Sequence, residues 1–158
     1  LRPIQWAKLL LNLNNPVNAL SELPLREQLL TRGYRRVLAA LQDEALRVLD
    51  AARIEPARLT PLPARWLPTV LRLPTPLFRL AAARLLRIDA KARSSMADDL
   101  AHGRITEIDG LCGEVVRMAQ GLNLAAPLNA RMAALVHEQS LLPQRYDAAR
   151  LQAALGLR

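Results

Sequence analysis

The sequence predicts an all-α protein folded as one helical bundle. Hydrophobic residues make up 51% of the 158 residues, and most of them are Leu and Ala, which favour helices. Aromatic residues amount to only 3%, and the runs of Val, Ile and Thr that favour strands are scarce. The hydrophobic positions recur at helical spacing over long stretches. A chain of this length can bury one ordinary core, so residues 1–158 are expected to form a single domain.

The first expected helix covers residues Ile4 to Leu20. Its apolar residues are too dense for an amphipathic surface helix, so we expect it to be largely buried. Pro16 removes a helical hydrogen bond and clashes with the preceding turn. A kink or a break is therefore expected near Asn14 and Asn15.

A long helix is expected from Leu25 to about Ala52, where apolar residues keep helical spacing through two or more heptads. Gly33 is its weak point, because Gly costs about 1 kcal/mol relative to Ala inside a helix. The apolar residues of this helix would serve either the core or a homodimer interface. The sequence leaves that choice open.

Prolines dominate the next segment, from Pro56 to Pro76, which holds six of them. Each removes a backbone donor and restricts the residue before it, so a connector with at most one short helix is expected. A helix should resume at Leu77 and fade between Asp89 and Arg93.

Start and stop signals mark the remaining helices. Ser95 and Asp98 have the spacing of a capping box, and Thr106 with Asp109 repeats that signal. Gly103 suits a left-handed cap between the two helices. Pro127 at a first-turn position opens a last long helix, expected to continue through Val136.

Charge and composition narrow the function classes. The net charge is +8 and the pI is near 11.1, but the 22 basic residues are spread among 14 acidic ones, without a long basic run, zinc-finger spacing or aromatic platform. We therefore expect no nucleic-acid partner and read the charge as a basic surface or an anion-binding cleft. The longest apolar stretches are far below the ~20 residues of a membrane helix, so no membrane partner is expected.

The single cysteine and the first residues of the sequence bear on the cellular location and on the extent of the protein. Cys112 cannot form an internal disulfide, which fits a reducing compartment, and a cytoplasmic location is expected. The chain begins at Leu1 without a signal peptide pattern, so we interpret it as part of a longer protein.

Polar residues on the first helix are the leading candidates for chemistry. Lys8, Asn12 and Asn15 follow at spacings of four and three, which places them on one face while leucines fill the others. One interpretation is a lysine that reaches solvent beside two asparagines near a helix break. The other is a proton-donating lysine at the floor of a dry cleft, with amides that bind a small polar ligand.

Two further candidates lie near expected helix starts. Glu107 fits a carboxylate stabilised by the helix dipole, and Ser95 fits an ordinary cap, although either could bind a ligand. His102 and His137 have no partner at metal-ligand spacing, so no metal site is expected. The sequence contains no GxGxxG, Walker or GxSxG motif that could hold a nucleotide phosphate or a catalytic serine.

Two segments together resemble the C-terminal domain of ketopantoate reductases (2-dehydropantoate 2-reductases), which is 6-phosphogluconate dehydrogenase C-terminal-like. They are WAKLLLNLNNPVNAL (6–20) and ARSSMADDLAHGRITEIDGLCGEVVRMAQGLNLAAPLN (92–129), in the family's order and at its spacing. The resemblance implies an upstream Rossmann domain that binds NADPH, with the active site between the two domains. It implies reduction of ketopantoate to pantoate, a step towards pantothenate and coenzyme A.

The resemblance also implies roles for five residues. Lys8 becomes the general acid, and Glu107 hydrogen-bonds a substrate hydroxyl. Asn12 and Asn15 bind the substrate near the reacting centre, and Ser95 helps to hold its carboxylate. Cys112 stands where the family commonly has Asn, so another 2-keto acid is an alternative substrate. The fragment alone is expected to be inactive, since hydride transfer needs the cofactor of the missing domain.

A different class of function stays open beside the enzyme. The chain could be a non-catalytic helical module for interaction or dimerisation. The two hypotheses differ over whether Lys8 and Glu107 face one cleft.

Overall fold

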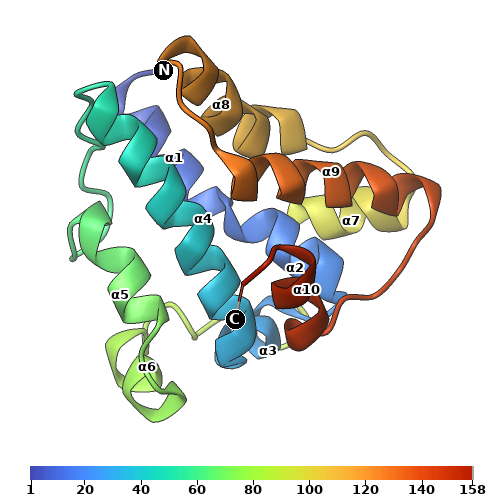
Figure 1. Cartoon of the computed structure of the whole chain (residues 1–158). Helices are drawn as coiled ribbons and strands as arrows, with labels where there is room; N and C mark the ends of the chain where they lie inside the picture. The colour runs from blue at the N-terminus through green and yellow to red at the C-terminus, as the bar shows by residue number, and fades with distance from the viewer. Residues whose placement is uncertain (158) are drawn as a thin grey trace.

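The computed structural model describes residues 1–157, and within them all regular structure is helical, which confirms the predicted all-α class (Figure 1). Ten α-helices and one 3-10 helix follow one another along the chain. Their bounds are α1 Pro3–Asn12, α2 Asn14–Ser21, α3 Leu25–Leu30, α4 Arg32–Ala51, η1 Ala64–Trp66, α5 Leu67–Leu71, α6 Thr75–Ala81, α7 Ser95–Ala101, α8 Ile108–Gly121, α9 Pro127–Leu141 and α10 Ala148–Ala154.

The longest helix, α4, runs through the middle of the molecule (Figure 1). On one side it contacts α5, and on the other it contacts α8 and α9, while α10 packs against its beginning. The apolar residues of α4 are buried, among them Val37, Leu38, Leu41, Ala45 and Leu49. They therefore serve the core of this chain, which answers the question that the sequence left open.

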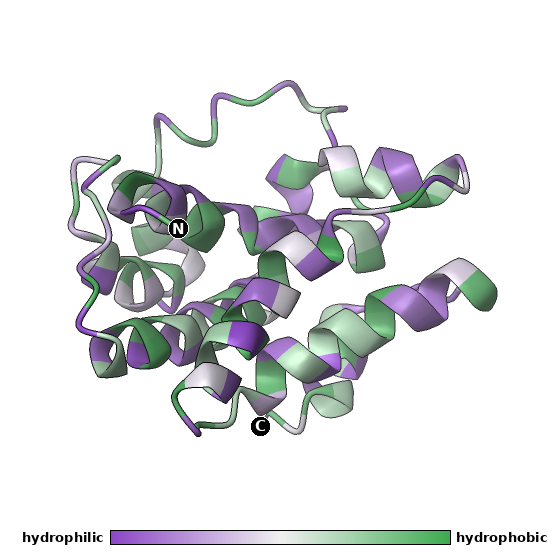
Figure 2. Cartoon of the chain, turned by 90° about the horizontal axis from the view of Figure 1, so that it is seen from above, coloured by the Kyte–Doolittle hydropathy of each residue, from purple (hydrophilic) through white to green (hydrophobic). Residues whose placement is uncertain are grey.

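Hydrophobic and hydrophilic residues are interspersed along the helices (Figure 2). This pattern is typical of helices that each bury one face against neighbours. Among residues 1–157, none of the helices combines the length and the apolar character that crossing a membrane requires.

The predicted break of the first helix near Asn14 and Asn15 is confirmed. The break lies at Leu13, between α1 and α2, and Pro16 falls inside the first turn of α2, where its missing N–H costs little. Most of the segment is buried as expected, but Ile4 and Leu11 are exposed on α1.

The predicted continuous helix from Leu25 to Ala52 is wrong in one respect. The chain leaves helical geometry at Thr31, whose φ of −94° and ψ of 109° separate α3 from α4. Gly33 lies inside α4, in its first turn, and is not the point of rupture.

Gly33 is instead a point of close approach. A Cβ at this position would lie 2.6 Å from the Cβ of Ala148 on α10. The absence of a side chain therefore lets α10 lie against the start of α4.

We predict that Gly33→Ala destabilises the protein by about 1–3 kcal/mol, since overpacking outweighs the gain in helix propensity. Urea unfolding measures the change. Gly110→Ala is the matched control, because Gly110 also lies in a helix but has no neighbouring atom within 4 Å of the added Cβ. It should raise the free energy of unfolding by about 0.5–1 kcal/mol, and equal responses of the two variants would contradict the packing role of Gly33.

The remaining boundaries agree in part with the predictions. The proline-rich connector holds η1 and α5 as one short helical stretch, but the next helix, α6, begins at Thr75 and ends at Ala81, both earlier than expected. Gly103 has a φ of +66°, which confirms its left-handed cap, and Pro127 opens α9. Helix α9 continues past Val136 to Leu141, and α10 was not predicted.

Candidate active site

Helix α1 presents its polar candidates to the outside. Lys8 and Asn12 lie one turn apart and are exposed, whereas the opposite face buries Trp6, Leu9 and Leu10. The predicted shared face is confirmed for Lys8 and Asn12 alone, because Asn15 lies on α2, and the apolar residues Ile4 and Leu11 are also exposed on α1. Residues 1–157 do not enclose Lys8, so its ammonium group is open to another domain or to a ligand.

Asn15 follows after the break at Leu13 and is half-buried in the first turn of α2. Its backbone carbonyl accepts a hydrogen bond from Ser94 Oγ at 3.3 Å, across 79 residues of sequence. The structure thus brings Asn15 next to Ser94 and Ser95 at the beginning of α7.

The predicted capping box at Ser95 is wrong, because the cap is the preceding residue. Ser94 has the extended backbone of an N-cap, and its Oγ accepts a hydrogen bond from the N–H of Ala97 at 3.1 Å. Ser95 is therefore the first helical residue, and it is exposed. Since Ser94 already caps the helix, the hydroxyl of Ser95 is available for a ligand.

Glu107 is the N-cap residue of α8, one position before the first helical residue, and it is exposed. The predicted capping box of Thr106 and Asp109 is wrong by one residue, because Glu107 is the N-cap and has no side-chain cap bond. Thr106 Oγ1 instead accepts a hydrogen bond from the N–H of Ile108 at 3.4 Å. Within residues 1–157, Lys8 and Glu107 form no ion pair with each other. The geometry joins the backbone of Asn15 with the start of α7.

A hollow of about 220 Å³ lies between the end of α7, the start of α8 and α9, and Thr106, the residue before Glu107, lines it. The imidazole Nε2 of His137 is 3.0 Å from Asp109 Oδ1 at its wall, across 28 residues of sequence. Neither residue was predicted as a site residue. Only their helical placement on α8 and α9 brings them together.

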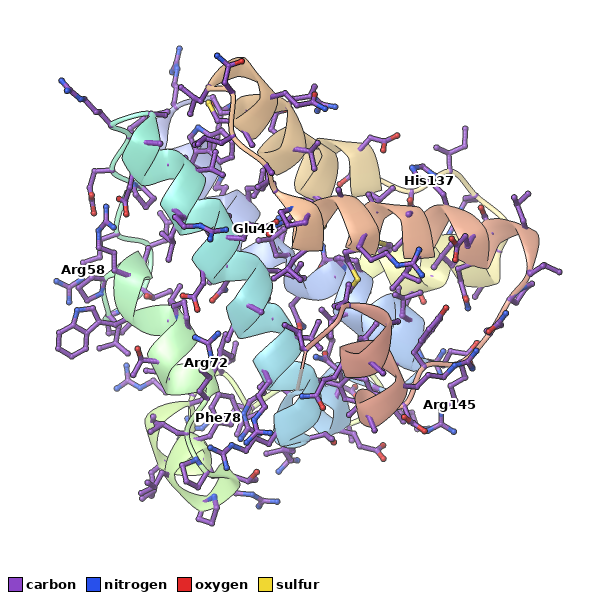
Figure 3. All side chains as sticks on the ribbon, in the orientation of Figure 1. Glu44, Arg58, Arg72, Phe78, His137 and Arg145 are labelled. Carbon is purple, nitrogen blue, oxygen red and sulfur yellow. The ribbon has the colours of Figure 1, made fainter. Side chains whose placement is uncertain are left out.

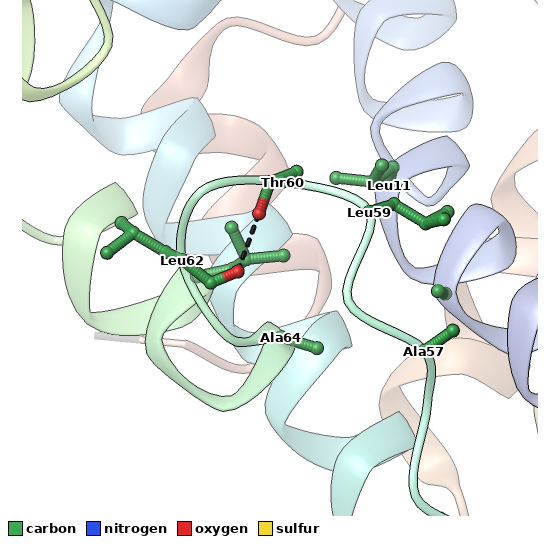
Figure 4. Close-up of a pocket in the computed structure, with 8 residues that line it drawn as sticks. Leu11, Ala57, Leu59, Thr60, Leu62 and Ala64 are labelled. Atoms are coloured by element: carbon green, nitrogen blue, oxygen red, sulfur yellow. Dashed lines mark hydrogen bonds between the residues drawn. The ribbon is translucent and has the colours of Figure 1, made fainter.

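A second cavity, of about 10 Å³, lies between α1 and residues 57–64 (Figure 4). Leu11, Leu59 and Leu62 line it, and Thr60 Oγ1 donates a hydrogen bond to the carbonyl of Leu62 at 2.7 Å. A space of this size holds about one water molecule, so it is no substrate site.

Burial governs the reactivity of the single cysteine. Cys112 is fully buried, and burial raises the pKa of its thiol well above the ordinary value, so the thiol stays protonated at neutral pH. Within residues 1–157, no three His, Cys, Asp or Glu side chains gather as metal ligands would.

Comparison with known protein families gives a match over residues 1–140 to the family described as ketopantoate reductase PanE/ApbA C terminal. This chain belongs to that family. The ketopantoate reductase C-terminal domain therefore covers all five candidate residues. A comparison with the curated proteins found no match.

Solved structures of ketopantoate reductases have the same fold. A PanE/ApbA family ketopantoate reductase from Ralstonia eutropha JMP134 is 28% identical, with a TM-score of 0.64 over 89% of this chain and 41% of that chain. A dimeric ketopantoate reductase from Staphylococcus aureus is 18% identical, with a TM-score of 0.61 over 88% of this chain and 43% of that chain. This chain thus spans less than half the length of either protein.

Proposed function

We propose that this ketopantoate reductase C-terminal domain is the substrate-binding part of an NADPH-dependent 2-dehydropantoate 2-reductase, which converts ketopantoate to pantoate for pantothenate and coenzyme A synthesis. A related 2-keto acid is the alternative substrate. The observation that carries the proposal is the family match across residues 1–140, combined with the exposed Lys8 and Asn12 on one face of α1.

The cofactor would be bound mainly by a Rossmann domain upstream in the same protein. This sequence has no glycine-rich loop for a nucleotide phosphate, and the face of α1 that carries Lys8 is open to a second domain. NADPH, when bound, supplies the hydride that is added to the ketone carbon.

Lys8 would supply the proton. Negative charge develops on the ketone oxygen when the carbon accepts a hydride, and a proton delivered to that oxygen in the same step avoids a free alkoxide. The Nζ of Lys8 can donate it, and the neutral amine then takes a proton from water. Asn12, one turn further along the same exposed face, can hydrogen-bond the substrate beside the reacting carbon.

The other three residues would bind and orient the 2-keto acid. The backbone of Asn15 is bonded to Ser94, the residue before Ser95, so an amide and a hydroxyl from two helices would meet the substrate. Ser95 would bind the carboxylate. Glu107, exposed at the start of α8, would accept a hydrogen bond from a substrate hydroxyl when the domains close.

The test is Lys8→Ala in the full-length enzyme, which should lower kcat with ketopantoate by about 100-fold or more through loss of general acid catalysis. Lys91→Ala is the matched control, because Lys91 is the only other lysine of the chain and is also exposed. Steady-state oxidation of NADPH measures both variants. The control should retain the wild-type kcat.

Two outcomes would count against this proposal. Unchanged kcat in Lys8→Ala would remove Lys8 from the mechanism. Absence of turnover by the wild-type protein with ketopantoate and with other 2-keto acids would favour a non-catalytic interaction or dimerisation module.

A further inference from the structure

A set of buried polar side chains connects α2 to α3 and α7 by hydrogen bonds, close in sequence to the candidate residues Asn15 and Ser95. Asn14 and Gln28 exchange two hydrogen bonds, of 3.1 and 2.9 Å, between α2 and α3. Asn18 lies one turn after Asn14 on the same buried face of α2 and is fully buried. Its amide connects three segments of the chain.

The Asn18 amide uses both its donor and its acceptor. The Nδ2 group donates to the carbonyl of Leu23 at 2.9 Å and to Gln28 Oε1 at 3.5 Å. The Oδ1 atom accepts a hydrogen bond from the backbone N–H of Ser94 at 2.9 Å. Because this N–H is buried, it would lose a hydrogen bond without Asn18, and the start of α7 would lose its fixed place against α2.

These bonds reach both helices of the proposed substrate site. Ser94 is bonded to Asn18 through its N–H and to the Asn15 carbonyl through its Oγ. Ser95 is its chain neighbour. The separation between Asn15 and Ser95 is thus set by one buried amide and one serine, neither of which needs to touch the substrate.

We infer that Asn18 is a positioning residue of the substrate site, holding the Ser95 hydroxyl and Asn15 at the separation that the substrate requires. The inference rests on the proposed function, since it concerns the same site. Asn18 acts through Ser94, so it is not a catalytic residue. Its loss should weaken binding of the 2-keto acid while the cofactor, bound mainly by the other domain, is unaffected.

The experiment compares Asn18→Leu with the wild-type full-length enzyme. Leucine has a similar size but cannot bond the Ser94 N–H. The KM for the 2-keto acid should rise about 10- to 100-fold, as expected when substrate-binding groups are displaced by about 1 Å. The KM for NADPH should stay at the wild-type value. A loss of folded protein alone would change neither KM, so a rise in the KM for the 2-keto acid alone points to the substrate site.

Asn129→Ala is the matched control for burial of an amide. Asn129 is also fully buried, but its side chain donates to the Leu41 carbonyl and Glu44 Oε1, both on α4. This variant should lose stability without a change in the KM for the 2-keto acid. An equal rise of that KM in both variants would overturn the inference.

Two milder variants, both at Ser94, test the inference if Asn18→Leu does not fold. Ser94→Ala removes the hydrogen bond to the Asn15 carbonyl and the cap bond from the Ala97 N–H, and Ser94→Thr retains a hydroxyl for both. The KM for the 2-keto acid should rise in the first and return towards the wild-type value in the second. A wild-type KM in Ser94→Ala would contradict the inference.

Hydrogen exchange separates this inference from the proposed function. If the wild-type enzyme turns over no 2-keto acid, the proposed function fails by itself. The amides of residues 94–97 should still exchange faster in Asn18→Leu than in Asn129→Ala. Equal exchange in the two variants would show that Asn18 does not hold the start of α7, and the positioning role would then also fail.

Discussion

Replacing Arg35 with alanine should lower the free energy of unfolding by about 4 kcal/mol or more, since two buried carbonyls and one partly buried carbonyl lose their donors at about 1–3 kcal/mol each. The guanidinium is fully buried on α4. Its nitrogens donate to the carbonyls of Leu71 at 2.9 Å, Leu29 at 3.0 Å and Leu73 at 2.8 Å. A cavity at the position of the lost side chain would add to the loss.

Arg35 is buried and has no carboxylate partner among residues 1–157. Leu29 and Leu71 lie at the C-terminal ends of α3 and α5, where carbonyls without helical partners and the helix dipole provide partial negative charge. The Phe78 ring of α6 adds a cation–π contact, with its centroid 4.2 Å from the guanidinium carbon. Burial lowers the pKa of Arg35, and the nearby charge of Arg32 lowers it further, yet a guanidinium remains protonated at neutral pH.

Arg36→Ala is the matched control for this prediction. Arg36 is the next residue of α4 and is exposed, so its removal should change the unfolding free energy by no more than about 0.5 kcal/mol. Urea unfolding of both variants measures the two changes in unfolding free energy. A loss in Arg35→Ala no larger than that in Arg36→Ala would mean that the guanidinium does not join α3, α5 and α6.

The same contacts explain why one helix boundary could not be predicted. The segment from Leu25 to Ala52 has no Pro, and its only Gly is Gly33, so local signals favour one helix. The break at Thr31 lies between two residues whose side chains bond to distant segments. Gln28 bonds to Asn14, and Arg35 bonds to the carbonyls of Leu71 and Leu73. Tertiary contacts of this kind override helix propensity, which is a weak signal.

Predictions from local chemistry were more accurate. The left-handed Gly103 and the start of α9 at Pro127 depend only on the conformations that Gly and Pro allow. The cap of α7 was placed one residue late because two serines, Ser94 and Ser95, stand side by side and either can cap a helix.

For the candidate site too, local patterns predicted positions within one helix, and they did not predict contacts between distant segments. Spacing along one helix placed Lys8 and Asn12 on one face, and the structure confirms this placement. The proximity of Asn15 to the start of α7 comes from a hydrogen bond between segments 79 residues apart, which periodicity does not encode. The family resemblance, carried by motifs in both segments, was the only sequence signal that linked them.

Glu44→Ala should be the second strongly destabilising substitution, with a loss of about 3–5 kcal/mol. Glu44 lies on α4 facing the beginning of α9 and is 2% exposed (Figure 3). Its carboxylate accepts hydrogen bonds from the N–H groups of Leu128 at 2.9 Å and Asn129 at 2.8 Å. Without it, one buried and one partly buried N–H group lose their acceptor, at about 1–3 kcal/mol each, and the favourable charge at the helix N-terminus is lost.

The start of α9 depends on this distant carboxylate because its own sequence supplies no cap. Ala126 at the N-cap has no side-chain acceptor, and Pro127 has no N–H to satisfy. Asp43→Ala is the control, since Asp43 is the exposed neighbour of Glu44 and forms only a surface ion pair with Arg72, worth about 0–1 kcal/mol. Thermal unfolding and hydrogen exchange of the first turn of α9 measure both variants. Equal melting temperatures and equal exchange rates in Glu44→Ala and Asp43→Ala would contradict this prediction. They would mean that the Glu44 carboxylate does not stabilise the start of α9.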